Sequence, residues 1–371
     1  MRIGLTKPDW GISGGFEVLI DRIVEHLLDL GHEVETLAVA GTPPDRRVDG
    51  RLVPDTEWDG APMAWAYRSL TSRFAELDAT HVDLVISTQP GSWAVEHPRK
   101  LALFYHHHRL AYDLEPMAEQ VGLDPDRHAA EAEAIRQADD PHVPTIGHYL
   151  VPSATVGRRL ERFWNVAESD TTRYLAGPIS AVASAPSPTP GTSALCVSRS
   201  EFPKRTELFV AAAHEGFAAD AHLVGAGGQL GAVRRWAAER SAGIPVDPRP
   251  WERAPVHERV EVVVPDHPVT IHGRLSDDDL ADRYADAAVL VAPAMDEDYG
   301  LTVLEGFSHG VPAVVCDDGG GLTEFVDDGV NGLITRPESA DLAAAVRRIS
   351  GDESLSARLR AGAAATAAGA A

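Results

Sequence analysis

The segment from residue 288 to residue 316 constrains the fold more than any other part of this 371-residue chain. It begins with an apolar run at 288–293 and ends with a second one at 313–316. Between them lie a polar stretch, a tight turn at Tyr299-Gly300 and a helical pattern. Short, continuous apolar runs are typical of parallel strands buried on both faces. The sequence therefore predicts strand, loop, helix and strand, which is the building unit of open α/β sheets.

Two glutamates flank the turn in this segment. Glu297 lies in the polar stretch, and Glu305 lies eight positions later in the helical pattern. The first N–H groups of a helix have no partner within the helix, so the backbone from Tyr299 through Gly300 and Leu301 to Thr302 can meet an anion. Glu305 lies about two turns further along the helix. The two carboxylates can therefore contact different parts of one extended ligand.

The combination of these features resembles the signature of a known enzyme family. Glu297-x7-Glu305, with an aromatic-Gly pair inside it and Gly-Val-Pro after it, is similar to the motif of family 4 glycosyltransferases. The segments 319–324 and 328–333 also resemble this family, whereas two glutamates at this spacing alone are common on solvated helices. The resemblance implies an α/β protein of the GT-B architecture, with two Rossmann-like domains facing across a cleft and a retaining mechanism.

The expected domain boundary lies in a segment of linker-like composition. Residues 181–193 are rich in Pro, Ser and Ala, and the chain is long enough for two domains. The resemblance implies an N-terminal Rossmann-like domain over residues 1–185 that binds the acceptor. It also implies a C-terminal Rossmann-like domain over residues 186–371 that binds a nucleoside-diphosphate sugar donor.

Composition excludes some classes of partner. The net charge is −23, shared about equally between the two halves, so neither half has the basic character of a nucleic-acid or anionic-lipid binder. No apolar run is long enough for an integral membrane segment, and the start of the chain lacks a signal-peptide core. Cys196 and Cys316 lie in apolar strand patterns and are expected to be reduced. We therefore expect a cytoplasmic enzyme with a soluble small-molecule or saccharide acceptor, for example in natural product biosynthesis.

A glycine-rich turn at 11–15 follows the first predicted strand. Its spacing is not G-x-G-x-x-G, so it lacks the dinucleotide fingerprint. The family resemblance implies that Gly14 and Gly15 let backbone N–H groups approach the donor diphosphate. The alternative is an ordinary turn in which the glycines serve only the backbone geometry.

Two cations and a glycine complete the expected donor site. Arg199-x4-Lys204 resembles the family's pair that binds the donor diphosphate, and Arg suits bidentate phosphate contact while Lys supplies a point charge. A solvated basic pair is the alternative. Gly273-Arg274 resembles the segment whose backbone meets the nucleotide base. The family often has Gly directly after the Lys, whereas Arg205 stands here.

Three consecutive histidines, His106, His107 and His108, end an apolar run that predicts a strand over 101–109. Adjacent residues of a strand point to opposite faces, so the three cannot all bind one metal ion. The resemblance implies that one of them contacts the donor sugar, with His107 and His106 preferred to His108. Asp296-x-Asp298 imitates a metal-binding motif, but inside this loop we interpret it as coincidence. No metal and no cofactor are predicted.

The expected reaction is glycosyl transfer with retention through a front-face substitution. The resemblance implies that Arg199 and Lys204 stabilise the leaving diphosphate, that Glu297 orients the sugar hydroxyls and that Glu305 accepts from the ribose hydroxyls. A sugar phosphorylase of the same architecture, a nicotinamide oxidoreductase and a non-catalytic nucleotide-sugar-binding protein are the alternatives. After residue 349 the chain is rich in Ala and Gly without clear periodicity, so no closing helix is predicted there.

Overall fold

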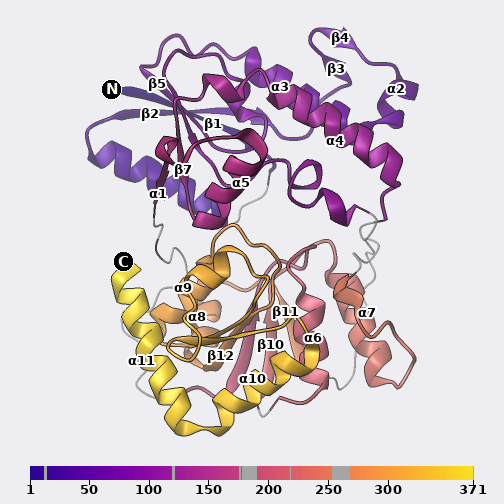
Figure 1. The fold of residues 1–371 in the computed structure, drawn as a ribbon, viewed down its shortest axis with the longest axis vertical. Coiled ribbons are helices and arrows are strands. Elements are labelled where there is room, and N and C mark those ends of the chain that lie inside the picture. The colour runs from indigo at the N-terminus through magenta and orange to yellow at the C-terminus, as the bar shows by residue number, and fades with distance from the viewer. Residues whose placement is uncertain are drawn as a thin grey trace. The chain divides into compact units, whose positions relative to one another are not determined.

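The structure is a computed structural model that describes residues 1–11, 15–118, 122–174, 177, 190–217, 219–252 and 268–370. The chain forms two compact units, Met1–Tyr174 and Leu175–Ala371, called unit 1 and unit 2 below (Figure 1). The boundary predicted between residues 185 and 186 lies outside the described residues. Within the described ranges, no helix combines the length and the apolarity needed to cross a bilayer.

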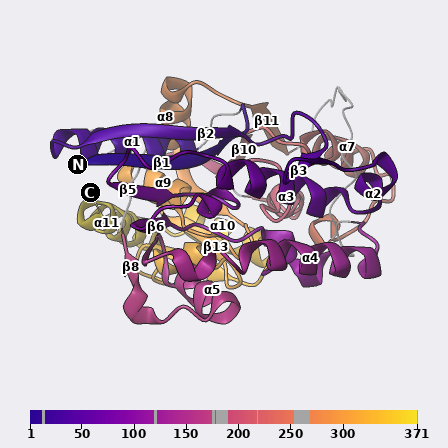
Figure 2. The same ribbon diagram turned by 90° about the horizontal axis from the view of Figure 1, so that it is seen from above.

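Unit 1 is built on a six-stranded parallel sheet with the order β2-β1-β5-β6-β7-β8. Its strands are β1 (Arg2–Asp9), β2 (Glu33–Ala40), β5 (Leu84–Ser87), β6 (Lys100–Leu103), β7 (His148–Val151) and β8 (Thr171–Arg173). Its helices are α1 (Gly15–Asp29), α2 (Asp55–Gly60), α3 (Pro62–Ala75), α4 (Pro125–Asp139) and α5 (Ala154–Trp164), and β3 (Arg47–Val48) pairs with β4 (Arg51–Leu52). Figure 2 shows β1, β2 and β5 side by side.

Local signals explain where several helices of unit 1 begin and end. Asp124 caps α4 by accepting a hydrogen bond from the Arg127 N–H at 2.9 Å, and Ser153 caps α5 in the same way. Asn165, in the left-handed region with φ of 52°, ends α5. Because β6 and β7 pair in parallel, the residues that follow them lie at one edge of the sheet, the edge where ligands of open α/β proteins bind.

Unit 2 has the same architecture, with the strand order β11-β10-β9-β12-β13-β14. Its strands are β9 (Ser193–Val197), β10 (Asp220–Val224), β11 (Val269–Gly273), β12 (Ala287–Ala292), β13 (Ala313–Cys316) and β14 (Gly332–Thr335). Its helices are α6 (Thr206–His214), α7 (Leu230–Ser241), α8 (Asp277–Ala285), α9 (Leu301–Ser308), α10 (Ser339–Gly351) and α11 (Glu353–Ala370). The predicted strand, loop, helix and strand over 288–316 are confirmed as β12, α9 and β13.

Alternation along the strands of unit 2 divides its core between two faces of the sheet. Cys196 packs with residues of α6, α7 and α10, whereas its neighbour Leu195 packs with residues of α8, α9 and α11. All six residues of β12 are buried, as expected for a central strand covered on both faces. Cys196 and Cys316 are both free and buried in this core.

Two predictions about the secondary structure are wrong. The strand expected over 101–109 ends at Leu103, so the three histidines follow β6 in a loop. The Ala- and Gly-rich end of the chain forms α11, whose contacts are chiefly with α9 and α10. Ala is the best helix former, and a row of small and apolar side chains at four-residue spacing is buried there: Leu355, Leu359, Ala363 and Ala367.

Candidate functional site

The candidate site of unit 2 lies where the loops after β9, β12 and β13 meet. These strands are neighbours in the sheet, so their carboxyl ends share one edge. Backbone hydrogen bonds join the loops: the Met295 N–H donates to the Pro203 carbonyl at 3.0 Å, and the Asp296 N–H donates to the Asp318 carbonyl at 2.8 Å. The loops are therefore held together by their backbones, independently of the site's side chains.

Two residues singled out from the sequence meet in this site. The Lys204 ammonium donates to the Glu297 carboxylate, although the residues lie 93 positions apart. Their side chains are 22% and 20% exposed, so both remain reachable from solvent. Arg199 is exposed in the loop that follows β9. Unit 2 thus places a cation and a carboxylate in contact at the ligand-binding edge of its sheet.

Glycines allow the loop after β13 to lie against Glu297. The Glu297 N–H donates to the Gly319 carbonyl at 3.1 Å, and the Gly321 N–H donates to the Glu297 carbonyl at 2.7 Å. Gly320 has φ of +60°, and a Cβ on it would lie 2.8 Å from the Glu297 backbone nitrogen. A side chain at position 320 would therefore push the loop away from Glu297.

Glu305 lies deeper than Glu297 and has a partner that the sequence did not reveal. It is 4% exposed, and its Oε2 accepts a hydrogen bond from the Tyr284 hydroxyl at 3.1 Å. Tyr284, from α8, is fully buried and stacks on His309 with ring centroids 5.2 Å apart. Burial, and then the Glu305 charge, raise the pKa of Tyr284 well above its usual value, so the hydroxyl stays protonated as a donor. The sequence signal for the burial of Tyr284 is weak: Leu280 and Tyr284 are apolar residues four positions apart on an otherwise acidic helix.

The turn that opens α9, whose backbone is predicted to contact an anion, is largely buried. Gly300 precedes the first helical residue, Leu301, which with Thr302 is half-buried. Tyr299 is 5% exposed and packs edge-on against Phe325 with centroids 4.9 Å apart. The contribution available from Tyr299 to a ligand is therefore its backbone rather than its ring.

Gly273 and Arg274 lie at the end of β11, at the same edge of the sheet. Gly273 has φ of +77°, and its carbonyl accepts from the Gly225 N–H at 2.8 Å. Arg274 is exposed. In the two strands before this turn, Nδ1 of His222 lies 3.0 Å from Nε2 of His272, and burial lowers the pKa of both rings. The backbone at Gly273 is thus fixed by the neighbouring strand.

The site residues expected in unit 1 are described only in part. Gly14 lies outside the described residues, and Gly15 is the exposed first residue of α1. His106 is half-buried, with its Nδ1 2.7 Å from the His107 carbonyl. His107 is fully buried among aromatic rings of four residues: Phe104, Tyr112, Phe163 and Trp164.

His108 is half-buried in unit 1, where it packs edge-on against Tyr67 with centroids 5.4 Å apart. Burial, with the charge of His106, lowers the pKa of His108 to about 4, so the ring is neutral at physiological pH. The three rings thus occupy three different environments. The sequence instead predicts that they point to alternate faces of a strand. Across the described part of the chain, no group of three or more His, Cys, Asp or Glu is placed to hold a metal ion.

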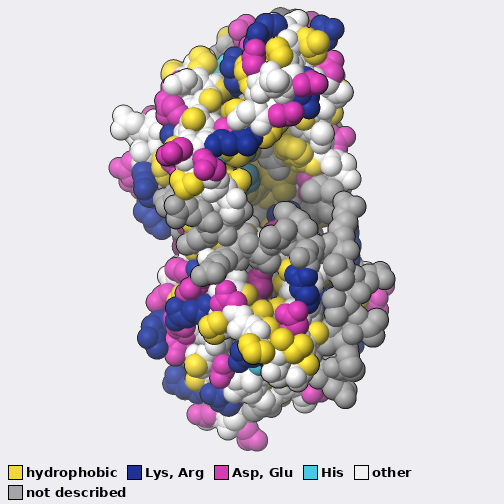
Figure 3. Space-filling view, turned by 90° about the vertical axis from the view of Figure 1, so that its right-hand side faces the viewer, with side chains coloured by type: hydrophobic (Ala, Val, Ile, Leu, Met, Phe, Trp, Pro, Cys, Tyr) yellow, Lys and Arg dark blue, Asp and Glu magenta, His cyan; other side chains and the backbone are white. Residues whose placement is uncertain are grey.

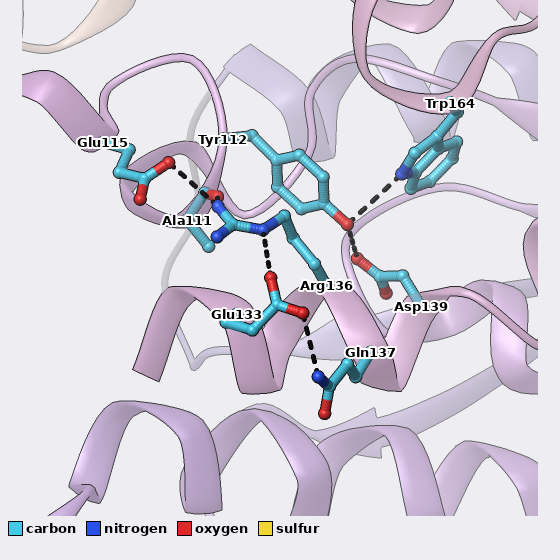
Figure 4. Close-up of polar contacts among 8 residues, drawn as sticks. All are labelled: Ala111, Tyr112, Glu115, Glu133, Arg136, Gln137, Asp139 and Trp164. Atoms are coloured by element: carbon cyan, nitrogen blue, oxygen red, sulfur yellow. Dashed lines mark hydrogen bonds and ion pairs between the residues drawn. The ribbon is translucent and has the colours of Figure 1, made fainter. Parts of the chain in front are cut away.

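Asp139 is a buried carboxylate in the interior of unit 1, and Figure 4 shows its contact with Tyr112 and that of Tyr112 with Trp164. Asp139 is fully buried at the end of α4 and accepts hydrogen bonds from three neutral donors. The Tyr67 hydroxyl lies 2.5 Å and the Trp93 indole N–H 2.8 Å from Oδ1, and the Tyr112 hydroxyl lies 2.8 Å from Oδ2. The Trp164 indole N–H donates in turn to the Tyr112 hydroxyl at 3.2 Å. This cluster joins α3, α4 and α5 and has no counterpart in the family motifs.

Comparison with known proteins assigns the class of unit 2. Residues 191–352 match the sequence model of the family described as "Glycosyl transferases group 1". This part of the chain is a group 1 glycosyltransferase domain, as the motifs around Glu297 predict. A D-inositol 3-phosphate glycosyltransferase from Streptomyces bingchenggensis is 41% identical over 88 residues, which are 24% of this chain and 19% of that protein. The chain thus aligns with only about a fifth of that relative's length.

Solved structures define the fold of the whole chain. Sucrose-phosphate synthase from Thermosynechococcus elongatus has a TM-score of 0.68 at 17% identity, over 99% of this chain and 94% of its own. Anabaena HepE, solved in complex with UDP, has a TM-score of 0.61 at 16% identity, over 100% of this chain and 95% of its own. These likenesses show the fold alone, and they confirm the predicted GT-B architecture.

Proposed function

We propose that this protein transfers a glycosyl group from a nucleoside-diphosphate sugar to a hydroxyl group of an acceptor, with retention and without a metal ion. The observation that carries the proposal is the meeting of Lys204 with Glu297 at the carboxyl edge of a group 1 glycosyltransferase domain. A donor has an anionic diphosphate next to a neutral sugar rich in hydroxyls. The cation of Lys204 suits the diphosphate, and the carboxylate of Glu297 suits the sugar hydroxyls.

The proposed reaction exchanges one bond for another on the same face of the sugar. A bond forms between the acceptor oxygen and the anomeric carbon, and the bond between that carbon and the diphosphate oxygen breaks. The acceptor proton passes to the leaving diphosphate, so no protein base is needed. Arg199 and Lys204 stabilise the charge that builds up on the diphosphate, which is the task that a metal ion performs in other enzymes.

The remaining roles keep the residues predicted from the sequence. Glu297 orients the sugar hydroxyls, and Glu305 binds the ribose hydroxyls while Tyr284 holds its other oxygen. The backbone from Tyr299 to Thr302 and at Gly273-Arg274 contacts the donor. In unit 1, Gly15 with Gly14 stay predicted contacts of the diphosphate. Of the two preferred histidines, His106 is the proposed contact of the sugar, because the ring of His107 is fully buried.

The identity of the nucleotide is the first point to test. HepE binds UDP, so UDP is the first candidate, with GDP, ADP and dTDP as competitors. A metal-independent rise in melting temperature with one diphosphate supports the proposal and identifies the base, because a ligand that binds only the native state stabilises it. A rise with NAD and with no diphosphate would contradict it.

Removal of Arg199 tests the assignment of the cations. Arg199→Ala should reduce donor turnover about 10- to 100-fold, since a charge-assisted hydrogen bond is worth about 1.5–3 kcal/mol. Arg348→Ala is the matched control, because Arg348 is an exposed arginine of α10 in the same unit. Equal turnover in the two variants would sink the role of Arg199.

The proposed acceptor is a soluble small molecule or saccharide, and the proposed location is the cytoplasm. Figure 3 shows acidic and basic side chains interspersed on the drawn face of each unit rather than gathered by sign. Such a surface, in a protein of net charge −23, is unlike the basic face of a nucleic-acid binder. Product formation from a panel of sugars, polyols and hydroxylated natural products tests this part.

A further inference from the structure

The residue after Lys204 makes an ion pair that the motifs do not explain. Arg205 precedes α6 with φ of 53°, in the left-handed region where glycine is more usual. Its side chain is 10% exposed, and its Nη1 lies 2.8 Å from Oδ2 and 2.9 Å from Oδ1 of Asp318. Arginine thus occupies a position where the resembling family often has glycine, and it uses this place to reach another loop.

Asp318 belongs to the loop that supports Glu297. Its carbonyl accepts from the Asp296 N–H at 2.8 Å, and the next residue, Gly319, accepts from the Glu297 N–H at 3.1 Å. The Arg205–Asp318 pair therefore connects the backbone beside Lys204 with the backbone beside Glu297. It makes this connection between residues 113 positions apart.

The contact between Lys204 and Glu297 is a weak means of keeping these loops in register. Both side chains are about one-fifth exposed and end long, rotatable chains, and pairs of this kind contribute little. The Arg205 side chain is more shielded, at 10% exposed, although that of Asp318 is 37% exposed, and a single guanidinium nitrogen, Nη1, contacts both carboxylate oxygens. Backbone hydrogen bonds hold these loops together, and the neighbouring pair adds a side-chain link that fixes the geometry at Lys204 and Glu297.

We propose that Arg205 and Asp318 are positioning residues that hold Lys204 and Glu297 at the separation a nucleoside-diphosphate sugar requires. This inference rests on the proposed function. Lys204 must reach the diphosphate while Glu297 reaches the sugar hydroxyls of the same donor. A loop shift of about 1 Å at either side is enough to reduce turnover markedly.

A set of substitutions in the full-length protein separates positioning from stability. Asp318→Asn removes the charge of one partner, Arg205→Lys keeps the charge but replaces the planar guanidinium with an ammonium group, and Arg205→Asn suits the left-handed backbone. Each variant should lower kcat/KM for the donor about 10-fold. The double variant Arg205→Asn with Asp318→Asn should have a kcat/KM no lower than that of the less active single variant, because the two residues act as a unit.

The control breaks a different ion pair of unit 2. Glu215→Gln removes the partly exposed pair with Arg240, whose atoms lie 3.2 Å apart, and should leave kcat/KM within about twofold. The melting temperature of every variant is measured alongside. A wild-type value of kcat/KM in Asp318→Asn and Arg205→Lys would overturn the proposal. A loss of kcat/KM that disappears when the assay is run well below the melting temperature would also overturn it, because it would reflect stability and not positioning.

A readout without any donor keeps this inference separate from the proposed function. The sequence contains three lysines, Lys7, Lys100 and Lys204, and Lys100 is 3% exposed. Acylation of Lys204 by an amine reagent, mapped by mass spectrometry, should be about threefold faster in Asp318→Asn than in the wild type, with Lys7 as the internal reference. An unchanged rate overturns the positioning role. A faster rate in a protein that consumes no nucleoside-diphosphate sugar overturns only the proposed function.

Discussion

Unit 1 and unit 2 each contain a buried carboxyl group with a raised pKa, Asp139 and Glu207, and surround it differently. Asp139 is fully buried and is held by hydroxyl and indole donors that carry no charge. Glu207 is 3% exposed in the first turn of α6, where its own backbone N–H and the charge of Arg205 lower its pKa against the effect of burial. Neutral donors surround Asp139 in unit 1, whereas charged groups surround the candidate site in unit 2.

The difference shows what each arrangement can do. Hydroxyl and indole groups satisfy Asp139 without a counter-charge, so the cluster stabilises the packing of three helices and offers nothing to an anionic ligand. The charges of unit 2 are paired between loops and are partly exposed, as at Lys204 and Glu297. Pairs of this kind can exchange partners when a charged ligand arrives, so unit 2 is the better candidate for donor binding.

The largest expected effect concerns the buried cluster of unit 1. Asp139→Ala leaves three buried donors without their acceptor, and each such loss costs about 1–3 kcal/mol. We expect a loss of about 3–5 kcal/mol in the free energy of unfolding of unit 1, with unit 2 little affected. Hydrogen exchange resolved by peptide checks this. Equal destabilisation of both units would contradict the comparison.

The pH dependence of stability should reveal both carboxyl groups. Burial raises the pKa of Asp139 to about 6, above the value near 3.9 of an unfolded chain. A raised folded-state pKa means that the contribution to stability is complete below pH ~4 and is lost as the pH rises through ~6, by about 3 kcal/mol. Denaturation of wild type and Asp139→Asn from pH 4 to 7 tests this: the difference between them should change with pH in that window.

Glu207 provides the corresponding test in unit 2. Burial raises its pKa to about 7, so its contribution should be lost between about pH 4.5 and pH 7. In Glu207→Gln this pH-dependent loss should disappear from unit 2 and persist in unit 1. A variant with the wild-type pH profile would show that Glu207 is ionised at low pH and that Arg205 outweighs burial.

A smaller effect is expected at the pair beneath the candidate site. Tyr284→Phe removes the hydrogen bond to Glu305 and should raise the donor KM about 5- to 20-fold with a small change in kcat. A bond to a charged group is worth about 1.5–3 kcal/mol, and only part of this is expected to reach the donor, because Tyr284 acts through Glu305. His309→Phe, which preserves the stacking on Tyr284, is the control. A change in kcat alone would indicate that Glu305 acts in the chemical step instead.

The smallest effects are expected at exposed ion pairs in either unit. Asp55→Asn breaks a 2.9 Å pair with Arg46 in unit 1, and Glu215→Gln breaks the pair with Arg240 in unit 2. Each should change the free energy of unfolding by less than about 0.5 kcal/mol. Chemical denaturation measures this, and a loss above 1 kcal/mol would mean that surface charge contributes more to these units than the buried groups suggest.

Much of the fold could be predicted because its signals are local. The apolar runs of β12 and β13, the turn at Gly300 and the start of α9 all lie within about thirty residues, and the structure confirms them. The histidines after β6 were harder, because an apolar run does not mark the residue at which a strand leaves its sheet. Helix α11 was missed because several of its buried residues are alanines, such as Ala363 and Ala367, and alanine gives only a weak hydrophobic pattern.

Local patterns in the sequence predict the α/β class, and the family resemblance of its motifs implies two Rossmann-like units and gives Arg199, Lys204, Glu297 and Glu305 as candidates. Which side chains touch depends on the tertiary structure. Asp139 meets Tyr67 across 72 positions, and Arg205 meets Asp318 across 113. The second contact follows from the order of strands in the sheet, which brings loops together at one edge, and the first follows from the packing of α4 against α3. No spacing along the chain encodes either arrangement.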